Sequence, residues 1–181
     1  AALREWERGR AVALIKGGAE YFARAGKATG VFNSRIDSLG PKGSGVSSSS
    51  SFQLAVAEIF NVYYNDGKLS PIFMAKASQY AENVYFGKPS GLMDQSAIAL
   101  GGVNMIDFRS FDEPEVVGAK WHFDDLEIFV VATGGDHSDL TDDYAAIPAE
   151  MKSVAAALGG TVLRDIPESK FYEEEEGLRA M

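Results

Sequence analysis

Three stretches of the sequence carry groups that could bind phosphate and a metal ion. The first, residues 41–51, consists almost wholly of glycine and serine. The second joins Glu82 to a turn that leads to Asp94, and the third is an acidic turn between Asp136 and Tyr144. Phosphoryl transfer needs a phosphate cradle, oxygen ligands for Mg²⁺ and a base near the acceptor hydroxyl. The three stretches could supply each of these parts.

The Gly/Ser stretch is followed by an apolar pattern at helical spacing, residues 52–63. A Gly/Ser loop that opens a helix presents free backbone N–H groups at the positive end of the helix dipole, where phosphate binds. The alternative is a flexible linker, the usual role of such a composition. The loop is not a Walker A motif, because Val46 stands where that motif has lysine.

The elements around this loop can be predicted from periodicity. Residues 3–25 have an apolar stripe and predict a helix that stops at Gly26, although Gly17 and Gly18 weaken it. The alternation over residues 28–37 predicts a strand that leads into the loop. A helix is then expected over residues 48–64, ended by the Asn-Asp-Gly turn at 65–67.

Ser70 and Pro71 predict the start of the next helix, as an N-cap and a first-position proline. Glu82 lies off the apolar stripe of this helix, so a solvated position is its ordinary interpretation. A Gly/Pro turn over residues 87–91 leads to a short helix that contains Asp94 and ends at residue 100.

The pattern of the remaining sequence predicts strands at residues 103–108, 115–122 and 126–133. We expect the last two strands to pair, and the strand at 126–133 to be central in its sheet because it is nearly all apolar. A helix follows the acidic turn and stops at Gly159 and Gly160, and residues 173–176 form a solvated charge run. The acidic turn admits a metal site (Asp136, His137, Asp139, Asp142) or, more commonly, an acidic helix start.

Composition limits the function. The 181 residues suffice for one domain with a sizeable core, and the net charge of −9 disfavours nonspecific nucleic-acid binding. The absence of cysteine excludes a disulfide framework and a thiol nucleophile. No apolar run approaches a membrane span. We therefore expect a cytoplasmic protein whose partners are small molecules, neither nucleic acid nor membrane, and a monomer, although the sequence leaves the oligomeric state open.

The motifs resemble those of galactokinases, a family within the GHMP kinases. Pro41-x-Gly-x-Gly-Val-Ser-Ser-Ser-Ser-Ser51 is similar to the family's second signature, P-x-G-x-G-L-S-S-S-A-S. A second resemblance is to the family's Q-x-A-E run, which corresponds to Gln79-Tyr80-Ala81-Glu82. The run that follows it in the family, G-x-P-x-G-x-M-D-Q, is similar to Gly87-x-Pro-x-Gly91-x-Met-Asp-Gln95. His137-Ser138, with Tyr144 beyond it, resembles the H-S…Y segment. The order and spacing agree over nearly the whole chain.

The resemblance implies an α+β fold of the GHMP-kinase N-terminal domain type (ribosomal-protein-S5-domain-2-like) and cofactors ATP and Mg²⁺. Ser49 and Glu82 would ligate Mg²⁺, and Asp94 would be the catalytic base or would orient the sugar C1 hydroxyl. Gly91, Asp94 and Tyr144 would contact the sugar. The phosphate cradle would be formed by Gly43, Ser44, Gly45, Val46, Ser47, Ser48, Ser49 and Ser50.

Each residue also has an ordinary structural interpretation. Ser49 could be only an N-cap, Asp94 only a helix cap, and Tyr144 only a core residue. The family's first signature, which holds the sugar and an arginine, and its glycine-rich third signature are absent from residues 1–181. We therefore expect an incomplete fold, the central part of a galactokinase-like chain whose last residues enter the second domain. The start without Met agrees with this.

The expected activity is phosphorylation of galactose at C1. One alternative is a related kinase for N-acetylgalactosamine, galacturonate, arabinose or mevalonate, since the decisive sugar contacts lie in the missing signature. A second alternative is a catalytically silent homologue that senses sugar and ATP. A third concerns residues 1–181 alone, which could fold without being active.

Overall fold

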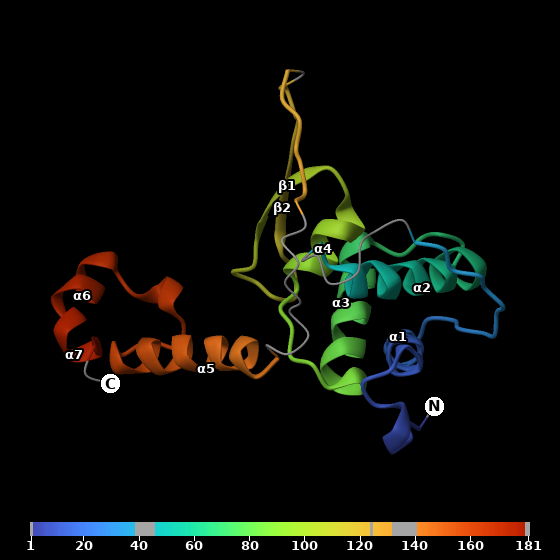
Figure 1. The fold of residues 1–181 in the computed structure, drawn as a ribbon, viewed down its shortest axis with the longest axis horizontal. Helices are drawn as coiled ribbons and strands as arrows, with labels where there is room; N and C mark the ends of the chain where they lie inside the picture. The colour runs from blue at the N-terminus through green and yellow to red at the C-terminus, as the bar shows by residue number, and fades with distance from the viewer. Residues whose placement is uncertain (1, 39–45, 124, 132–140, 180–181) are drawn as a thin grey trace. The chain divides into compact units, whose positions relative to one another are not determined.

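The computed structural model describes residues 2–38, 46–123, 125–131 and 141–179. It divides into two compact units, Ala1–Asp136 and His137–Met181. The first unit holds α1 (Ala11–Arg24), α2 (Ser48–Tyr64), α3 (Pro71–Tyr80), α4 (Met93–Leu100) and the hairpin of β1 (Val103–Asp107) and β2 (Glu115–Ala119) (Figure 1). Two short elements accompany them, the 3-10 helix η1 (Glu5–Glu7) and the π-helix η2 (Ala81–Phe86). Helices and a two-stranded sheet together agree with the expected incomplete α+β fold.

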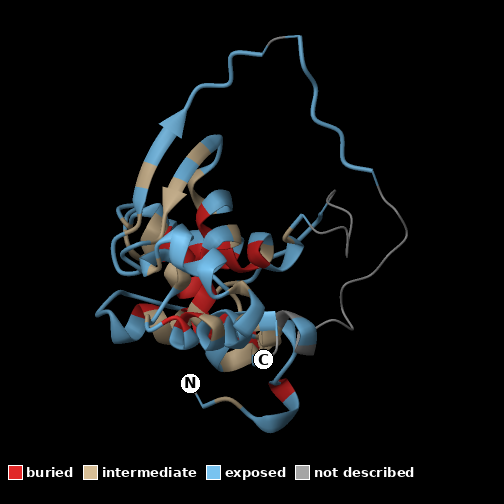
Figure 2. Ribbon diagram, turned by 90° about the vertical axis from the view of Figure 1, so that its left-hand side faces the viewer, coloured by how far each residue is buried: buried red, intermediate tan, exposed pale blue. Residues whose placement is uncertain are grey.

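The core of the first unit lies between α1, α2 and α3 (Figure 2). Phe22 of α1 is fully buried, and its ring packs edge-on against Phe73 of α3 at 5.1 Å between centroids. Phe60 of α2 lies 5.5 Å from Phe22. These contacts join α1, α2 and α3 into one core.

Helix α1 is shorter than predicted, because residues 5–7 form the separate η1 and the α-helix begins at Ala11. The two glycines do not interrupt it. A Cβ on Gly17 would lie 2.6 Å from the Cα of Ala81, so glycine at this position allows α1 and η2 to approach closely. The predicted stop is confirmed: Gly26 has φ +67°, and the N–H of Lys27 donates back to the carbonyl of Phe22.

Helices α2 and α3 occur as predicted. The Oγ of Ser70 accepts a 3.2 Å hydrogen bond from the N–H of Phe73, and Pro71 is the first residue of α3. The last turn of α3 passes directly into η2, which ends at Gly87 with φ +93°. A π-helical turn widens the backbone locally and is frequent at functional sites.

The strand predicted over residues 28–37 is wrong: this segment is extended but pairs with no strand in the described part of the chain. Side chains of α2 satisfy part of its backbone instead. Asn65 exchanges two hydrogen bonds with Ala28, at 3.1 and 2.9 Å, and the hydroxyl of Tyr64 donates to the carbonyl of Val31 at 2.6 Å. Alternating polarity predicts an extended chain but does not supply the neighbouring strand that a ladder needs.

The predicted pairing of residues 115–122 with 126–133 is also wrong. Strand β2 pairs antiparallel with β1, with Val103 opposite Ala119 and Asp107 opposite Glu115. Residues 126–131 form no strand, and their large apolar side chains are exposed, including Ile128 and Val131 at 78% each. They are not a central strand within the described residues; residues 132 and 133 lie outside these.

The second unit contains α5 (Thr141–Ala157), η4 (Leu163–Asp165), α6 (Glu168–Glu173) and α7 (Glu175–Arg179). Ala155 and Leu158 are buried, whereas Met151 of the predicted apolar side is half exposed. Gly159 has φ +77° and ends the helix as expected. No helix in the described ranges is long and apolar enough to span a membrane.

Candidate functional site

A small pocket of about 200 Å³ lies where the start of α2, η2 and the start of α4 meet. The start of α2 is far from the other two elements in the sequence, and packing of α2 and α4 against α3 holds them together. The pocket combines hydroxyls, carboxylates and one cation, and its lining residues are Ser49, Ser50, Glu82, Lys88, Ser90, Gly91, Met93, Asp94 and Gln95.

The start of α2 offers unpaired backbone donors. Ser47 is the N-cap residue, with φ +56° and no side-chain cap bond, and its carbonyl accepts the first helical bond from the N–H of Ser51 at 3.0 Å. The first N–H groups of an α-helix have no intrahelical acceptor. The ordinary interpretation of Ser49 as the N-cap is therefore wrong, because Ser49 is the second helical residue and faces the pocket with Ser50.

The glycines of the predicted cradle, Gly43 and Gly45, lie with Ser44 outside the described residues, so their roles remain predictions. Val46 is described and exposed. The part of the cradle that the structure does describe runs from Val46 to Ser50.

Glu82 is not the solvated helix residue that its place off the apolar stripe suggested. It is the second residue of η2, and only 4% of it is exposed. Its Oε2 accepts a 2.9 Å hydrogen bond from Nε2 of Gln95. No lysine or arginine among the described residues forms an ion pair with it. A buried carboxylate without a cation is costly, which is a common sign of a ligand site.

Asp94 is the second residue of α4 and does not cap it, since Leu92 is the N-cap and no side-chain cap bond is present. Its Oδ2 accepts a 2.7 Å hydrogen bond from Oγ of Ser47. The predicted phosphate loop and the predicted base therefore touch directly.

The turn before α4 is fixed by Asn83 and Ser90. The Oδ1 of Asn83 accepts from the N–H of Ser90 at 2.7 Å and from its hydroxyl at 3.0 Å. The amides of Gln79 and Asn83 both donate to the carbonyl of Ser90. These bonds hold Gly91 and Asp94 against the end of η2.

The other predicted sugar contact belongs to the second unit. Tyr144 is in α5, and its side chain lies outside the described residues. Asp136, His137 and Asp139 lie outside them too, as does the side chain of Asp142. In the ranges that are described, no group of three or more His, Cys, Asp or Glu could hold a metal ion. The metal interpretation of the acidic turn stays a prediction.

Sequence reasoning did not assign four lining residues: Lys88, Ser90, Met93 and Gln95. Lys88 and Gln95 lie inside the motif Gly87-x-Pro-x-Gly91-x-Met-Asp-Gln95, so the sequence did contain a signal that could have pointed to them. Their roles depend on burial and partners, which periodicity does not give.

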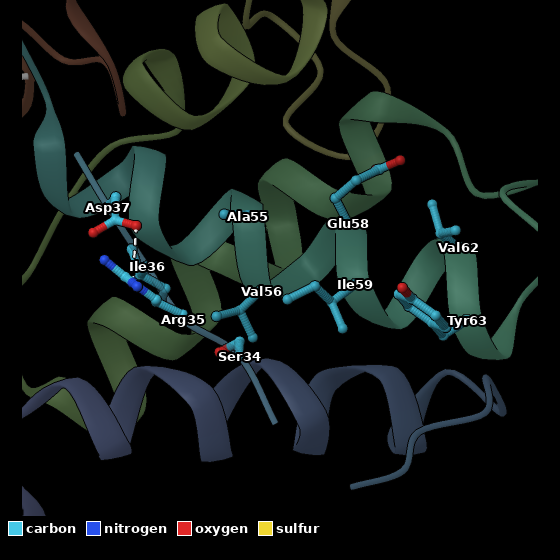
Figure 3. Close-up of a pocket in the computed structure, with 10 residues that line it drawn as sticks. All are labelled: Ser34, Arg35, Ile36, Asp37, Ala55, Val56, Glu58, Ile59, Val62 and Tyr63. Atoms are coloured by element: carbon cyan, nitrogen blue, oxygen red, sulfur yellow. Dashed lines mark ion pairs between the residues drawn. The ribbon is translucent and has the colours of Figure 1, made fainter. Parts of the chain in front are cut away.

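A larger groove of about 500 Å³ runs between residues 34–37 and the outer face of α2. Figure 3 shows Arg35 and Asp37 at one end, where they form a 3.2 Å ion pair, and Tyr63 at the other. Its lining is mainly apolar, with Ile36, Val56 and Ile59 among the side chains. Its described lining contains no glycine and none of the carboxylates or serines that the motifs single out, so the candidate site is the smaller pocket.

The smaller pocket fits Mg²⁺ by the kind of donors it offers. Mg²⁺ takes hard oxygen ligands and is usually bound by one or two carboxylates together with substrate phosphates and water. Ser49 offers a hydroxyl and Glu82 a buried carboxylate at the same pocket. A larger protein cluster is not needed for this kind of site.

Comparison with known proteins identifies the family of the chain. Residues 13–102 match the family described as GHMP kinases N terminal domain, and the chain belongs to this family. The match includes α2, Glu82 and Asp94.

Among curated proteins, the chain is similar to galactokinases. The galactokinase of Thermococcus kodakarensis is 32% identical over 170 residues, which cover 90% of this chain and 44% of that protein. That of Streptomyces coelicolor is 34% identical over 130 residues, 70% of this chain and 33% of that protein. That of Clostridium tetani is 48% identical over 65 residues, 36% of this chain and 17% of that protein. The chain spans less than half the length of these relatives.

Proposed function

We propose that the protein is an ATP- and Mg²⁺-dependent kinase that phosphorylates galactose at the C1 hydroxyl to give galactose 1-phosphate. The observation that carries this proposal is the pocket that Ser49, Glu82 and Asp94 line together, with Asp94 bonded to the N-cap of α2. The galactose preference rests on the names of the relatives.

We assign phosphate binding to the start of α2. The free N–H groups of its first turn and the helix dipole favour the negative charge of the ATP phosphates. We propose that residues 43–50 form this cradle. Among the described lining residues, Lys88 is the one cation, and it adds a positive charge.

Ser49 and Glu82 would hold the Mg²⁺ that accompanies ATP. When bound there, this ion would offset the charge of the β- and γ-phosphates. The buried position of Glu82 keeps its carboxylate out of bulk water, which strengthens its interaction with a cation.

Asp94 would accept the proton of the C1 hydroxyl. The O1–P bond forms, the bond between the γ-phosphorus and the bridging oxygen breaks, and ADP leaves. The hydrogen bond from Ser47 holds the Asp94 carboxylate beside the phosphate end of α2, so positioning provides much of the catalysis. Gly91 and Tyr144 would contact the sugar.

We also propose that residues 1–181 are the central part of this kinase, most of its N-terminal domain with the last residues entering the second domain. Its partners are then sugar and ATP, and we expect a cytoplasmic monomer.

The test is ADP release by the full-length protein with a panel of sugars, comparing wild type, Asp94→Asn and Asp66→Asn. Asp66 is an exposed carboxylate in the 65–67 turn with φ +58°, which asparagine also tolerates, so it is a matched control. We expect turnover with galactose that Asp94→Asn lowers by about 10²–10⁴-fold and the control leaves unchanged.

Full activity of Asp94→Asn would refute the role of the base. Binding of galactose and ATP without turnover would instead indicate a sensor, and turnover with another sugar only would change the substrate.

A further inference from the structure

We propose that Gln95 is the positioning residue of the metal site: its amide holds the Glu82 carboxylate in the orientation in which it would bind the cation. This inference rests on the proposed function, and it assigns a role to a side chain that does not itself touch the cation.

The first step is the burial of the pair. Gln95 is 1% exposed and Glu82 is 4% exposed, and the two side chains come from α4 and η2. Nε2 of Gln95 donates to Oε2 of Glu82 at 2.9 Å. A hydrogen bond to an ionised carboxylate is stronger than one between neutral groups. This bond therefore orients the Glu82 carboxylate, as a lysine or arginine partner would in an ion pair.

The second step is which oxygen remains free. Of the two Glu82 oxygens, only Oε2 accepts a hydrogen bond from a described residue. Oε1 is then the oxygen left for a cation, and Glu82 would bind it through this one atom. Groups that hydrogen-bond to a metal ligand orient that ligand, and their removal changes the metal affinity.

The third step is the other end of the amide. Oε1 of Gln95 is buried and has no hydrogen-bond partner in the described chain. A flipped amide does not remove the problem, because its oxygen would then face the Glu82 carboxylate. Because this oxygen is closed to solvent, the hydrogen bonds of the side-chain amide are those that Nε2 makes to Glu82 and Ser90. The amide is therefore held with its donor group toward the carboxylate.

Ser90 supports the same amide. Its Oγ lies 3.5 Å from Nε2 of Gln95, and its hydroxyl donates to Asn83. These hydrogen bonds therefore connect the turn before α4 to the proposed metal ligand, by way of Asn83, Ser90, Gln95 and Glu82.

The structure offers a matched control in Gln53 of α2. It is also buried, at 4% exposure, and neither its Nε2 nor its Oε1 has a partner among the described residues. Gln53→Met and Gln95→Met make the same chemical change in buried surroundings, but only the second removes a bond to Glu82.

The experiment uses the full-length protein with a non-hydrolysable ATP analogue and measures Mn²⁺ affinity by electron paramagnetic resonance, with the folded fraction of each variant counted by circular dichroism. We expect Gln95→Met to raise the Kd for Mn²⁺ about tenfold or more, and Gln53→Met to change it by less than about twofold. In assays with galactose, Gln95→Met should raise the Mg²⁺ concentration for half-maximal rate, and saturating Mg²⁺ should restore most of kcat.

Equal Kd values for Gln95→Met and Gln53→Met would overturn this inference while leaving the kinase proposal intact. If the wild-type protein neither binds Mn²⁺ in the presence of nucleotide nor phosphorylates a sugar, both this inference and the kinase proposal are overturned.

Discussion

The hydroxyl of Ser47 donates a 2.7 Å hydrogen bond to Oδ2 of Asp94. It joins the N-cap of α2 to the second residue of α4 across 47 positions of sequence. This bond therefore links the proposed phosphate end of the pocket to the proposed base.

Removing this bond tests its role. Ser47→Ala and Ser47→Gly both lack the hydroxyl, and we expect each to lower kcat roughly tenfold, the low end of what a hydrogen bond to a charged group contributes. Their stabilities should differ, because Ser47 has φ +56° and glycine avoids a cost of about 1 kcal/mol there. Steady-state kinetics and thermal unfolding measure the two effects. A wild-type kcat in Ser47→Gly would show that the bond does not serve catalysis.

Lys88 should contribute to nucleotide binding. We expect Lys88→Met to raise the KM for ATP about tenfold, a loss of about 1.4 kcal/mol, and this effect should shrink at high salt. Lys120→Met, at an exposed lysine beyond β2, is the control. An unchanged KM would mean that the Lys88 ammonium does not reach the phosphates.

Gly17 and Gly18 form a matched pair for stability. A Cβ on Gly17 would lie 2.6 Å from the backbone of Ala81, whereas one on Gly18 would meet no atom within 4 Å. We expect Gly17→Ala to destabilise by about 1–3 kcal/mol and Gly18→Ala to stabilise by up to about 1 kcal/mol, since alanine favours helix. Urea unfolding compares them.

Because Ala81 precedes Glu82, Gly17→Ala should also raise the Mg²⁺ requirement. An equal response of both glycines in the unfolding experiment would contradict the close approach of α1 and η2.

Glu7 gives a prediction about pH. Its hydrogen bond with Lys16 and one from the N–H of Arg4 hold the pKa of this carboxyl below its usual 4.5. A lowered pKa in the folded state stabilises the fold above the unfolded-state pKa, and this stability is lost as pH falls through the folded-state value. We expect Glu7→Gln to lower Tm at about pH 7 and to match wild type at about pH 2. Glu5→Gln, at an exposed position of η1, should change Tm little at either pH.

Local signals in the sequence determined α2, the start of α3 and the stops at Gly26 and Gly159. These features depend on helical periodicity, caps and positive φ, all of which act within a few residues. The motifs likewise determined the family and pointed to Ser49, Glu82 and Asp94. Pairing of residues 115–122 was mispredicted because strand partners are chosen by packing across the fold.

Only the tertiary structure decided how the site residues are surrounded. Glu82 lies off the apolar stripe in sequence yet is 4% exposed, because the π-helical turn that holds it packs against α1 and its carboxylate contacts Gln95 of α4. Its bond to Gln95 and the contact of Ser47 with Asp94 join residues 13 and 47 positions apart. Periodicity reports which face of one element is apolar, whereas the partner of a buried polar atom is set by which other elements pack against it.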